Sequence, residues 1–175
     1  VQRLHELDRE TFDILHRGVA EENICLVGGE ISDESPLSLL SQEGASQELE
    51  QGISLYEQYL GVRPFVFGRR RFGLSCNLPQ LLSKWGFVGA LHYTLDGNRS
   101  PESYHGSINW QGTDGSELSA LARTPLDAQK SESFLSLPRH IGDAMDNDHM
   151  VAIGFAHWPQ FVSRWYRELQ RIAKY

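Results

Sequence analysis

The stretch Gly61–Phe87 most constrains the fold, because it reads as a strand, a loop and a helix in succession. Pro64–Phe67 is a short apolar run rich in strand formers. Asn77 is a good helix N-cap residue, and leucines and a tryptophan then recur at helical spacing until Gly86. Phe87–Tyr93 is typical of a second strand. A strand–helix–strand unit implies neighbouring parallel strands.

Gly68 ends the first apolar run, and the loop Gly68–Cys76 that follows contains three consecutive arginines: Arg69, Arg70 and Arg71. In parallel α/β folds, functional residues gather in loops at the carboxyl ends of strands. Guanidinium groups suit carboxylates, phosphates or stacked sugar-like rings. A solvated basic loop without a ligand is an equally weighted alternative, since surface arginines are common.

The remaining pattern alternates between helix and strand. Helical spacing predicts helices over Leu4–Arg17, Leu37–Leu60 (one helix, or two broken at Gly44 or Gly52), Phe134–Met145 with a break near Pro138, and Gln160–Lys174. Strands are predicted over Asn23–Val27 (buried), Ser107–Gln111, Glu117–Arg123 and His149–Phe155, with polar loops over Gly97–Gly106 and Pro125–Ser133. We therefore expect one α/β domain over residues 1–175, with mostly parallel strands and a small antiparallel hairpin.

Composition narrows the classes of partner. The chain has 175 residues, enough for one domain with a hydrophobic core. Its net charge of −7 argues against a nucleic-acid partner despite the arginine run. The sequence contains neither a leader-like segment nor a long apolar run, so no membrane partner is expected. Cys25 and Cys76 are expected to be free core thiols rather than a disulfide.

Four segments, taken in order and spacing, resemble the catalytic domain of glycoside hydrolase family 38, the α-mannosidases. The resemblance extends over about Leu7–Leu121. Gly28–Glu34 resembles the family's double glycine followed by acidic residues, and Tyr59–Pro64 resembles its approach to the next strand. Phe72–Leu82 resembles its Phe-Gly-x-Ser-x-x-Leu-Pro signature, and Trp110–Ser116 resembles its Trp-x-Gly-x-Asp-Gly-Ser hairpin.

The resemblance implies a partial or complete (β/α) barrel of the glycoside hydrolase/deacetylase type. A complete barrel of this family is longer, so the chain is expected to be a segment of a larger protein, with other domains of the same parent chain as partners. The family places its nucleophilic, zinc-binding aspartate at the position of Arg70. A guanidinium can neither attack an anomeric carbon nor bind a metal cation. The family's His-x-Asp zinc pair also has no counterpart in this chain, so no zinc or other cofactor is expected.

The resemblance and the strand ends together suggest residues that would contact a carbohydrate partner. His157 follows the last predicted strand and is a candidate acid/base, although it could equally pack against Trp158. Glu30 and Asp33 would rim the site, although Asp33 could instead cap a helix. Trp110 is expected to be structural. The predicted binding residues are Glu30, Asp33, Arg70, Arg71, Tyr93, His157 and Trp158.

Three functions remain open at this point. The favoured hypothesis is a mannosidase-like carbohydrate-active domain that has lost its nucleophile and binds sugar. The alternative is a non-catalytic structural or protein-interaction module of a larger protein. The third is an active hydrolase that takes its missing carboxylate from Glu30 or Asp33. The spacing of the histidines matches no metal-binding motif, and the acidic residues of 143–148 are expected to be a solvated helix end.

Overall fold

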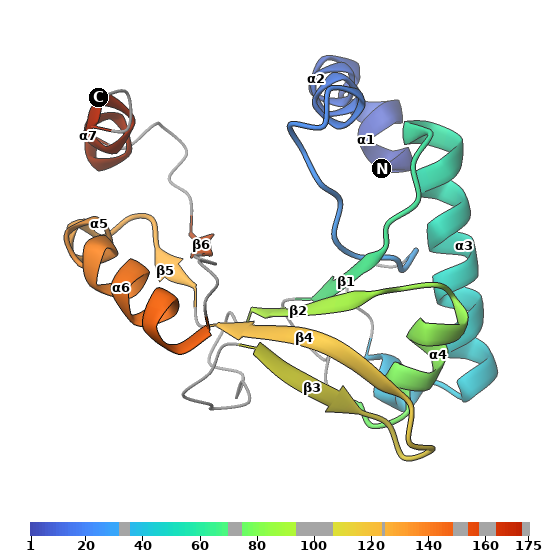
Figure 1. Cartoon of the computed structure of the whole chain (residues 1–175). Coiled ribbons are helices and arrows are strands. Elements are labelled where there is room, and N and C mark those ends of the chain that lie inside the picture. Colours follow the sequence, from blue (N-terminus) through green and yellow to red (C-terminus); the bar gives the residue numbers. More distant parts are fainter. Residues whose placement is uncertain are drawn as a thin grey trace. The chain divides into compact units, whose positions relative to one another are not determined.

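The computed structural model describes residues 1–31, 36–69, 75–93, 107–123, 125–148, 154–157 and 164–172 (Figure 1). The chain divides into two compact units. The first comprises Val1–His92 and Asn109–Leu121, and the second comprises Tyr93–Ile108 and Ala122–Tyr175. Whether the whole chain behaves as one domain stays a prediction.

The main sheet has four strands in the order β1-β2-β4-β3: β1 Val66–Arg69, β2 Gly89–Tyr93, β4 Glu117–Arg123 and β3 Ser107–Gln111. β1 and β2 are parallel, with Val66 opposite Gly89 and Arg69 opposite His92. Figure 1 shows β4 running alongside β2 in the same direction and β3 running the opposite way. The predicted α/β fold with mostly parallel strands and an antiparallel hairpin is therefore confirmed. Among the described residues the sheet is open rather than closed into a barrel.

Strand β1 continues through Gly68 to Arg69, so the prediction that Gly68 ends the strand is wrong. A Cβ on Gly68 would lie 2.2 Å from Cγ1 of Val27. Val27 lies on the neighbouring segment and forms a parallel bridge with Val66 of β1. The side chain of Val27 therefore packs against the backbone of Gly68, which leaves no room for a Cβ at this position of β1.

The N-terminal helix predicted over Leu4–Arg17 is two helices, α1 Gln2–Leu7 and α2 Arg9–Ala20. Asp8 separates them, because its carboxylate accepts a hydrogen bond from the Thr11 amide at 3.0 Å and caps the second helix.

A short 3₁₀ turn at Leu37–Leu39 precedes α3, Gln42–Leu60, which Ser41 caps. Neither Gly44 nor Gly52 breaks α3. α4, Leu78–Lys84, begins after Asn77 as predicted, although the Asn77 side chain makes no capping hydrogen bond. The C-cap residue is Trp85, and the predicted glycine, Gly86, follows it with a φ of +80°. None of the described helices has the length and apolarity needed to cross a bilayer.

The core of the first unit lies between α3, α4 and one face of the sheet. Phe67 is fully buried on that face, and Ala90 opposite it is 3 % exposed. Both neighbours of Phe67 in β1 are only half-buried, so successive residues alternate between a covered and an open face. The indole of Trp85 at the end of α4 donates a hydrogen bond to Ser46 of α3, which ties the two helices together.

The second unit contains α5 Ser131–Leu135, α6 Leu137–Asp148, α7 Arg164–Ile172 and a parallel pair of short strands, β5 Leu126–Asp127 and β6 Phe155–Ala156. The predicted loop Pro125–Ser133 is therefore partly wrong, because it contains β5 and the start of α5. The predicted break near Pro138 occurs at Ser136, between α5 and α6. The predicted loop at Gly97–Gly106 lies outside the described residues.

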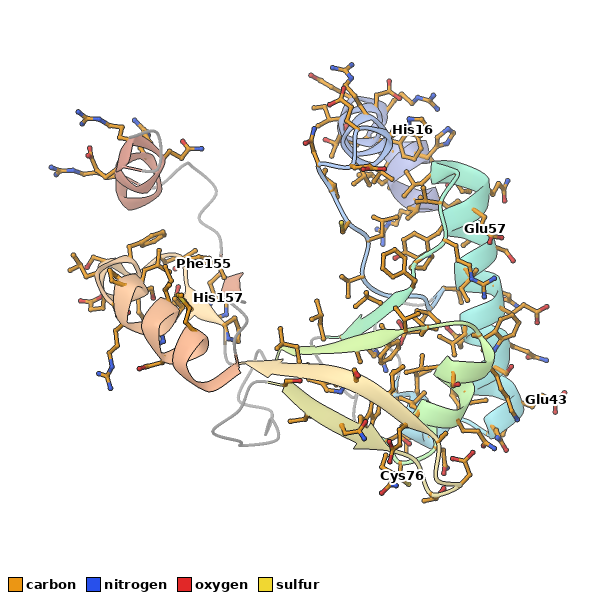
Figure 2. All side chains as sticks on the ribbon, viewed as in Figure 1. His16, Glu43, Glu57, Cys76, Phe155 and His157 are labelled. Atoms are coloured by element: carbon orange, nitrogen blue, oxygen red, sulfur yellow. The ribbon has the colours of Figure 1, made fainter. Side chains whose placement is uncertain are left out.

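The segment Asn23–Val27 is not a buried strand. Its one strand pairing is the bridge at Val27, and Ile24 and Val27 are 38 % and 40 % exposed. Cys25 and Cys76 are free thiols, as predicted, but both are exposed rather than in the core. Figure 2 shows Cys76 near the β3–β4 hairpin, where its carbonyl oxygen accepts a hydrogen bond from the Thr113 amide.

Candidate functional site

Three polar residues lie at the carboxyl ends of neighbouring parallel segments. Arg69 is the last residue of β1, and His92 lies opposite it on β2. Glu30 follows the segment that bridges to β1 at Val27. The carboxyl edge of a parallel sheet is where α/β folds place ligand sites. Glu30, Arg69 and His92 are therefore the candidate site of the first unit.

Glu30 and Arg69 form a buried ion pair. Nε of Arg69 lies 3.0 Å from Oε1 of Glu30, and the two side chains are 7 % (Glu30) and 1 % (Arg69) exposed. Arg69 is therefore a buried strand residue and not part of the loop Gly68–Cys76 in which the sequence places it. Charges buried to this degree persist only when they are paired, so this pair fixes the end of β1 to the loop that carries Glu30.

Helix α3 positions Glu30 through close backbone contact. The amide of Ile31 donates to the carbonyl oxygen of Glu48 at 3.2 Å. A Cβ on Gly52 would lie 2.2 Å from the Gly29 carbonyl oxygen, so α3 approaches the Gly29–Ile31 backbone more closely than any side chain allows. Burial raises the pKa of Tyr56 on the same helix, and the nearby negative charge of Glu30 raises it further.

His92 is a buried imidazole beside an aromatic ring. It is 4 % exposed, and its ring centroid lies 4.7 Å from that of Trp110 in an edge-on arrangement. Trp110 also lies 6.3 Å from the ring of Phe67, as its predicted structural role requires. Among the described residues, Nε2 of His92 has no hydrogen-bond partner. Burial lowers the pKa of His92 to about 4, so its imidazole is neutral at physiological pH.

His92 should make stability depend on pH in a defined window. Its pKa is about 4 in the folded chain, against the ordinary value of 6.5 that applies when the chain is unfolded, so the unfolded chain binds the proton more tightly. Stability should therefore be unaffected by His92 above pH 6.5 and fall progressively as the pH drops toward 4. The expected loss reaches about 3 kcal/mol.

The measurement is urea unfolding across this pH range for the wild type and His92→Gln. Carboxylates titrate in both proteins, so the difference between the two curves isolates His92. The difference should grow as the pH falls. A difference that stays constant with pH would show that His92 does not titrate as its burial implies.

In the second unit, two further polar residues meet at strand ends. Asp127 is the last residue of β5, and His157 directly follows β6. Nδ1 of His157 lies 3.6 Å from Oδ2 of Asp127. A hydrogen bond from the Gln129 amide lowers the pKa of Asp127, and the proximity of His157 and Lys130 lowers it further. The sequence indicates His157 but not Asp127, because Asp127 falls in the predicted loop.

The predicted binding residues are only partly described. Glu30 is buried in its ion pair with Arg69, whereas His157 is exposed in the second unit. Tyr93 ends β2, and its side chain lies outside the description. The remaining predicted residues, Asp33, Arg70, Arg71 and Trp158, also lie outside the described residues. Their grouping into one site stays a prediction.

His92 is a candidate that sequence reasoning missed. Its signal is a polar residue in an otherwise apolar strand, at the position where parallel strands present functional groups.

The residue that the resemblance assigns to the zinc-binding position does not suit a cation. The sequence has Arg70 there, whose permanent positive charge repels a metal ion. Among the residues that the structure describes, no group of three or more His, Cys, Asp or Glu side chains is placed to hold a metal ion.

Solved structures of other proteins share the fold of this chain. No protein-family model and no curated protein matches the chain. A solved structure assigned as a polysaccharide deacetylase from Mycobacterium smegmatis matches with a TM-score of 0.62 at 17 % identity, over 91 % of this chain and 59 % of that one. The 4-alpha-glucanotransferase from Thermococcus litoralis matches with a TM-score of 0.67 at 14 % identity, over 98 % of this chain and 28 % of that one.

The chain thus spans 59 % and 28 % of the two solved proteins. Both are named for reactions on carbohydrates. At these identities the likeness is one of fold alone. The chain has a mixed α/β fold of the (β/α) barrel type, with an open, mostly parallel sheet in its described part.

Proposed function

We propose that this chain is a carbohydrate-binding domain on an α-mannosidase-like scaffold related to glycoside hydrolase family 38, with hydrolysis impaired. The ordered motif resemblance supports the scaffold, and structural neighbours named for carbohydrate reactions support the ligand class. The observation that carries the proposal is the carboxyl edge of the sheet, where buried polar groups gather: Arg69 ends β1, His92 lies opposite it on β2, and Glu30 follows the segment that bridges to β1.

Binding without hydrolysis follows from the residue at the nucleophile position. Retaining glycosidases need a carboxylate that attacks the anomeric carbon and a second carboxyl group about 5 Å away. Arg70 stands at that position in the sequence. A guanidinium offers several hydrogen-bond donors to sugar hydroxyls but no nucleophilic electron pair. The side chain therefore favours recognition of a saccharide over its cleavage.

Glu30 is not available as a replacement nucleophile. Its carboxylate is buried against Arg69, and its side chain is 7 % exposed. A carboxylate that is paired in this way cannot approach an anomeric carbon without breaking the ion pair. The hypothesis of an active hydrolase that uses Glu30 is therefore disfavoured.

Titration with methyl α-mannoside and an α-linked mannobiose tests the proposal. We expect saturable binding with a dissociation constant of about 1 mM or lower, and no release of free mannose. Replacing both Arg70 and Arg71 with alanine should weaken binding about tenfold or more, because charge-assisted hydrogen bonds are lost. Arg139→Ala is the matched control, since Arg139 is an exposed arginine of α6 with a side chain 83 % exposed.

No binding of either saccharide at millimolar concentration would overturn the proposal. The non-catalytic interaction module would then be favoured, with Arg70 and Arg71 facing an acidic partner. Release of mannose by the wild type would contradict only the claim that hydrolysis is impaired and would leave the claim of saccharide binding intact.

A further inference from the structure

Asp127 and His157 end two adjacent parallel strands. Leu126 pairs with Phe155 and Asp127 with Ala156, so the carboxyl ends of β5 and β6 lie side by side. The ring of Phe155 stacks on that of Phe134 in α5, with centroids 5.3 Å apart, which anchors β6 to the helix that follows β5. Figure 2 marks the positions of Phe155 and His157. Packing of the strands therefore fixes the distance between the carboxylate and the imidazole.

The two oxygens of Asp127 have different partners. Oδ1 accepts a hydrogen bond from the Gln129 amide at 2.9 Å, which holds the carboxylate in one orientation. Oδ2 lies 3.6 Å from Nδ1 of His157 and 3.7 Å from Nζ of Lys130. The Lys130 side chain is 67 % exposed, so its contribution is weakened by solvent. Oδ2, the oxygen that is not engaged by the Gln129 amide, therefore faces the imidazole of His157.

His157 is exposed and has a constrained backbone. Its side chain is 54 % exposed, and its φ is +53°. Positive φ is uncommon for residues other than glycine, and histidine is among those that adopt it more readily. The separation of 3.6 Å exceeds a direct hydrogen bond, and a small rotation of the exposed His157 side chain would close it.

We propose that Asp127 is a positioning residue that keeps the proton of neutral His157 on Nδ1, so that Nε2 faces solvent as a hydrogen-bond acceptor for a saccharide hydroxyl. In this arrangement Nδ1–H donates to Oδ2 of Asp127, and Nε2 accepts from the hydroxyl. An aspartate acts on a histidine in this way by fixing its tautomer and orientation. The contact of Nε2 with a saccharide hydroxyl rests on the proposed function, whereas the position of the proton on Nδ1 does not.

The tautomer can be measured without any ligand. Two-dimensional ¹H–¹⁵N spectra at alkaline pH, where imidazoles are neutral, report which ring nitrogen is protonated. His157→Gln identifies the signals of His157, because they disappear in that variant. We expect wild-type His157 to be mainly protonated on Nδ1, although the free imidazole in water prefers protonation on Nε2.

Asp127→Asn should reverse the tautomer. The Gln129 amide keeps the carbonyl oxygen of the new side chain on its own side, so the NH₂ group faces Nδ1. Nδ1 must then accept, and the proton moves to Nε2. Asp114→Asn is the matched control, because Asp114 makes the same kind of turn with Ser116, at 3.1 Å to its amide. It should leave the His157 signals unchanged.

Binding of methyl α-mannoside to the same variants tests the proposed contact between Nε2 of His157 and a saccharide hydroxyl. Followed through the His157 signals themselves, the binding should weaken about three- to tenfold in Asp127→Asn, the loss expected for one hydrogen bond, and should be unchanged in Asp114→Asn. A wild-type His157 protonated on Nε2, or no change of tautomer in Asp127→Asn, overturns the positioning role. An Nδ1-protonated His157 with no loss of affinity in Asp127→Asn overturns the contact with saccharide. Absence of all saccharide binding overturns the proposed function itself.

Discussion

Replacing Glu30 with alanine is expected to lower the free energy of unfolding by about 3–5 kcal/mol, because it leaves a buried guanidinium without its carboxylate. Arg69 is 1 % exposed in its side chain and cannot recover water without disturbing the sheet. Urea unfolding followed by circular dichroism measures the loss. Asp13→Ala is the matched control, since it breaks the exposed Arg9–Asp13 pair, whose side chains are 62 % and 55 % exposed. It should cost less than about 1 kcal/mol.

A double variant separates charge from packing. In Glu30→Leu with Arg69→Met, both charges are replaced by apolar groups, and most of the lost stability should return. If Glu30→Ala lowers the free energy of unfolding no more than Asp13→Ala does, the ion pair does not stabilise the end of β1, and Glu30 does not belong to the candidate site. If the double variant is as unstable as Glu30→Ala, packing rather than charge accounts for the loss.

Replacing Gly52 with alanine should destabilise the chain by about 1–3 kcal/mol or more, although alanine is the better helix former. A Cβ there would lie 2.2 Å from the Gly29 carbonyl oxygen and 2.4 Å from the carbonyl carbon of Glu30. These are backbone atoms and cannot rotate away, so α3 or the Glu30 loop must shift. The ion pair of Glu30 with Arg69 should loosen with it.

Gly44→Ala in the same helix is the control. Its Cβ would meet Oγ of Ser41 at 3.4 Å and Cβ of Leu40 at 3.6 Å, which are ordinary contacts. This variant should be neutral or more stable by up to about 1 kcal/mol, because the helix propensity improves. Thermal unfolding of both variants measures the contrast. Equal stability of the two would contradict the close approach of α3 to the Glu30 loop.

The sequence predicts the α/β class and the hairpin well, because these follow from local periodicity. The β3–β4 hairpin has the bounds that its turn chemistry predicts, with Gly115 at a φ of +84°. The errors come from tertiary contacts. The local pattern predicts that Gly68 ends a strand, but Gly68 lies inside β1, where the close approach of Val27 leaves room only for a glycine. Asp8 divides a helix whose hydrophobic periodicity runs on without a break.

The candidate site could be predicted only in part for the same reason. The location at strand ends follows from parallel topology, and this topology indicates Glu30 and His157 as candidates. It does not indicate the residues that pair with them, because pairing across strands has no local signal. Arg69 reads as one of three loop arginines, and only the register of β1 shows that it is buried beside Glu30. Asp127 likewise reads as a loop residue until β5 is paired with β6.

The most direct test of a saccharide site at the carboxyl edge of the sheet is a map of backbone amide shifts on addition of methyl α-mannoside. We expect saturable shifts for the amides of Arg69 and His92, at the ends of β1 and β2, and none for the amides of α2. Shifts confined to α2, or an unchanged spectrum at millimolar saccharide, would contradict the account.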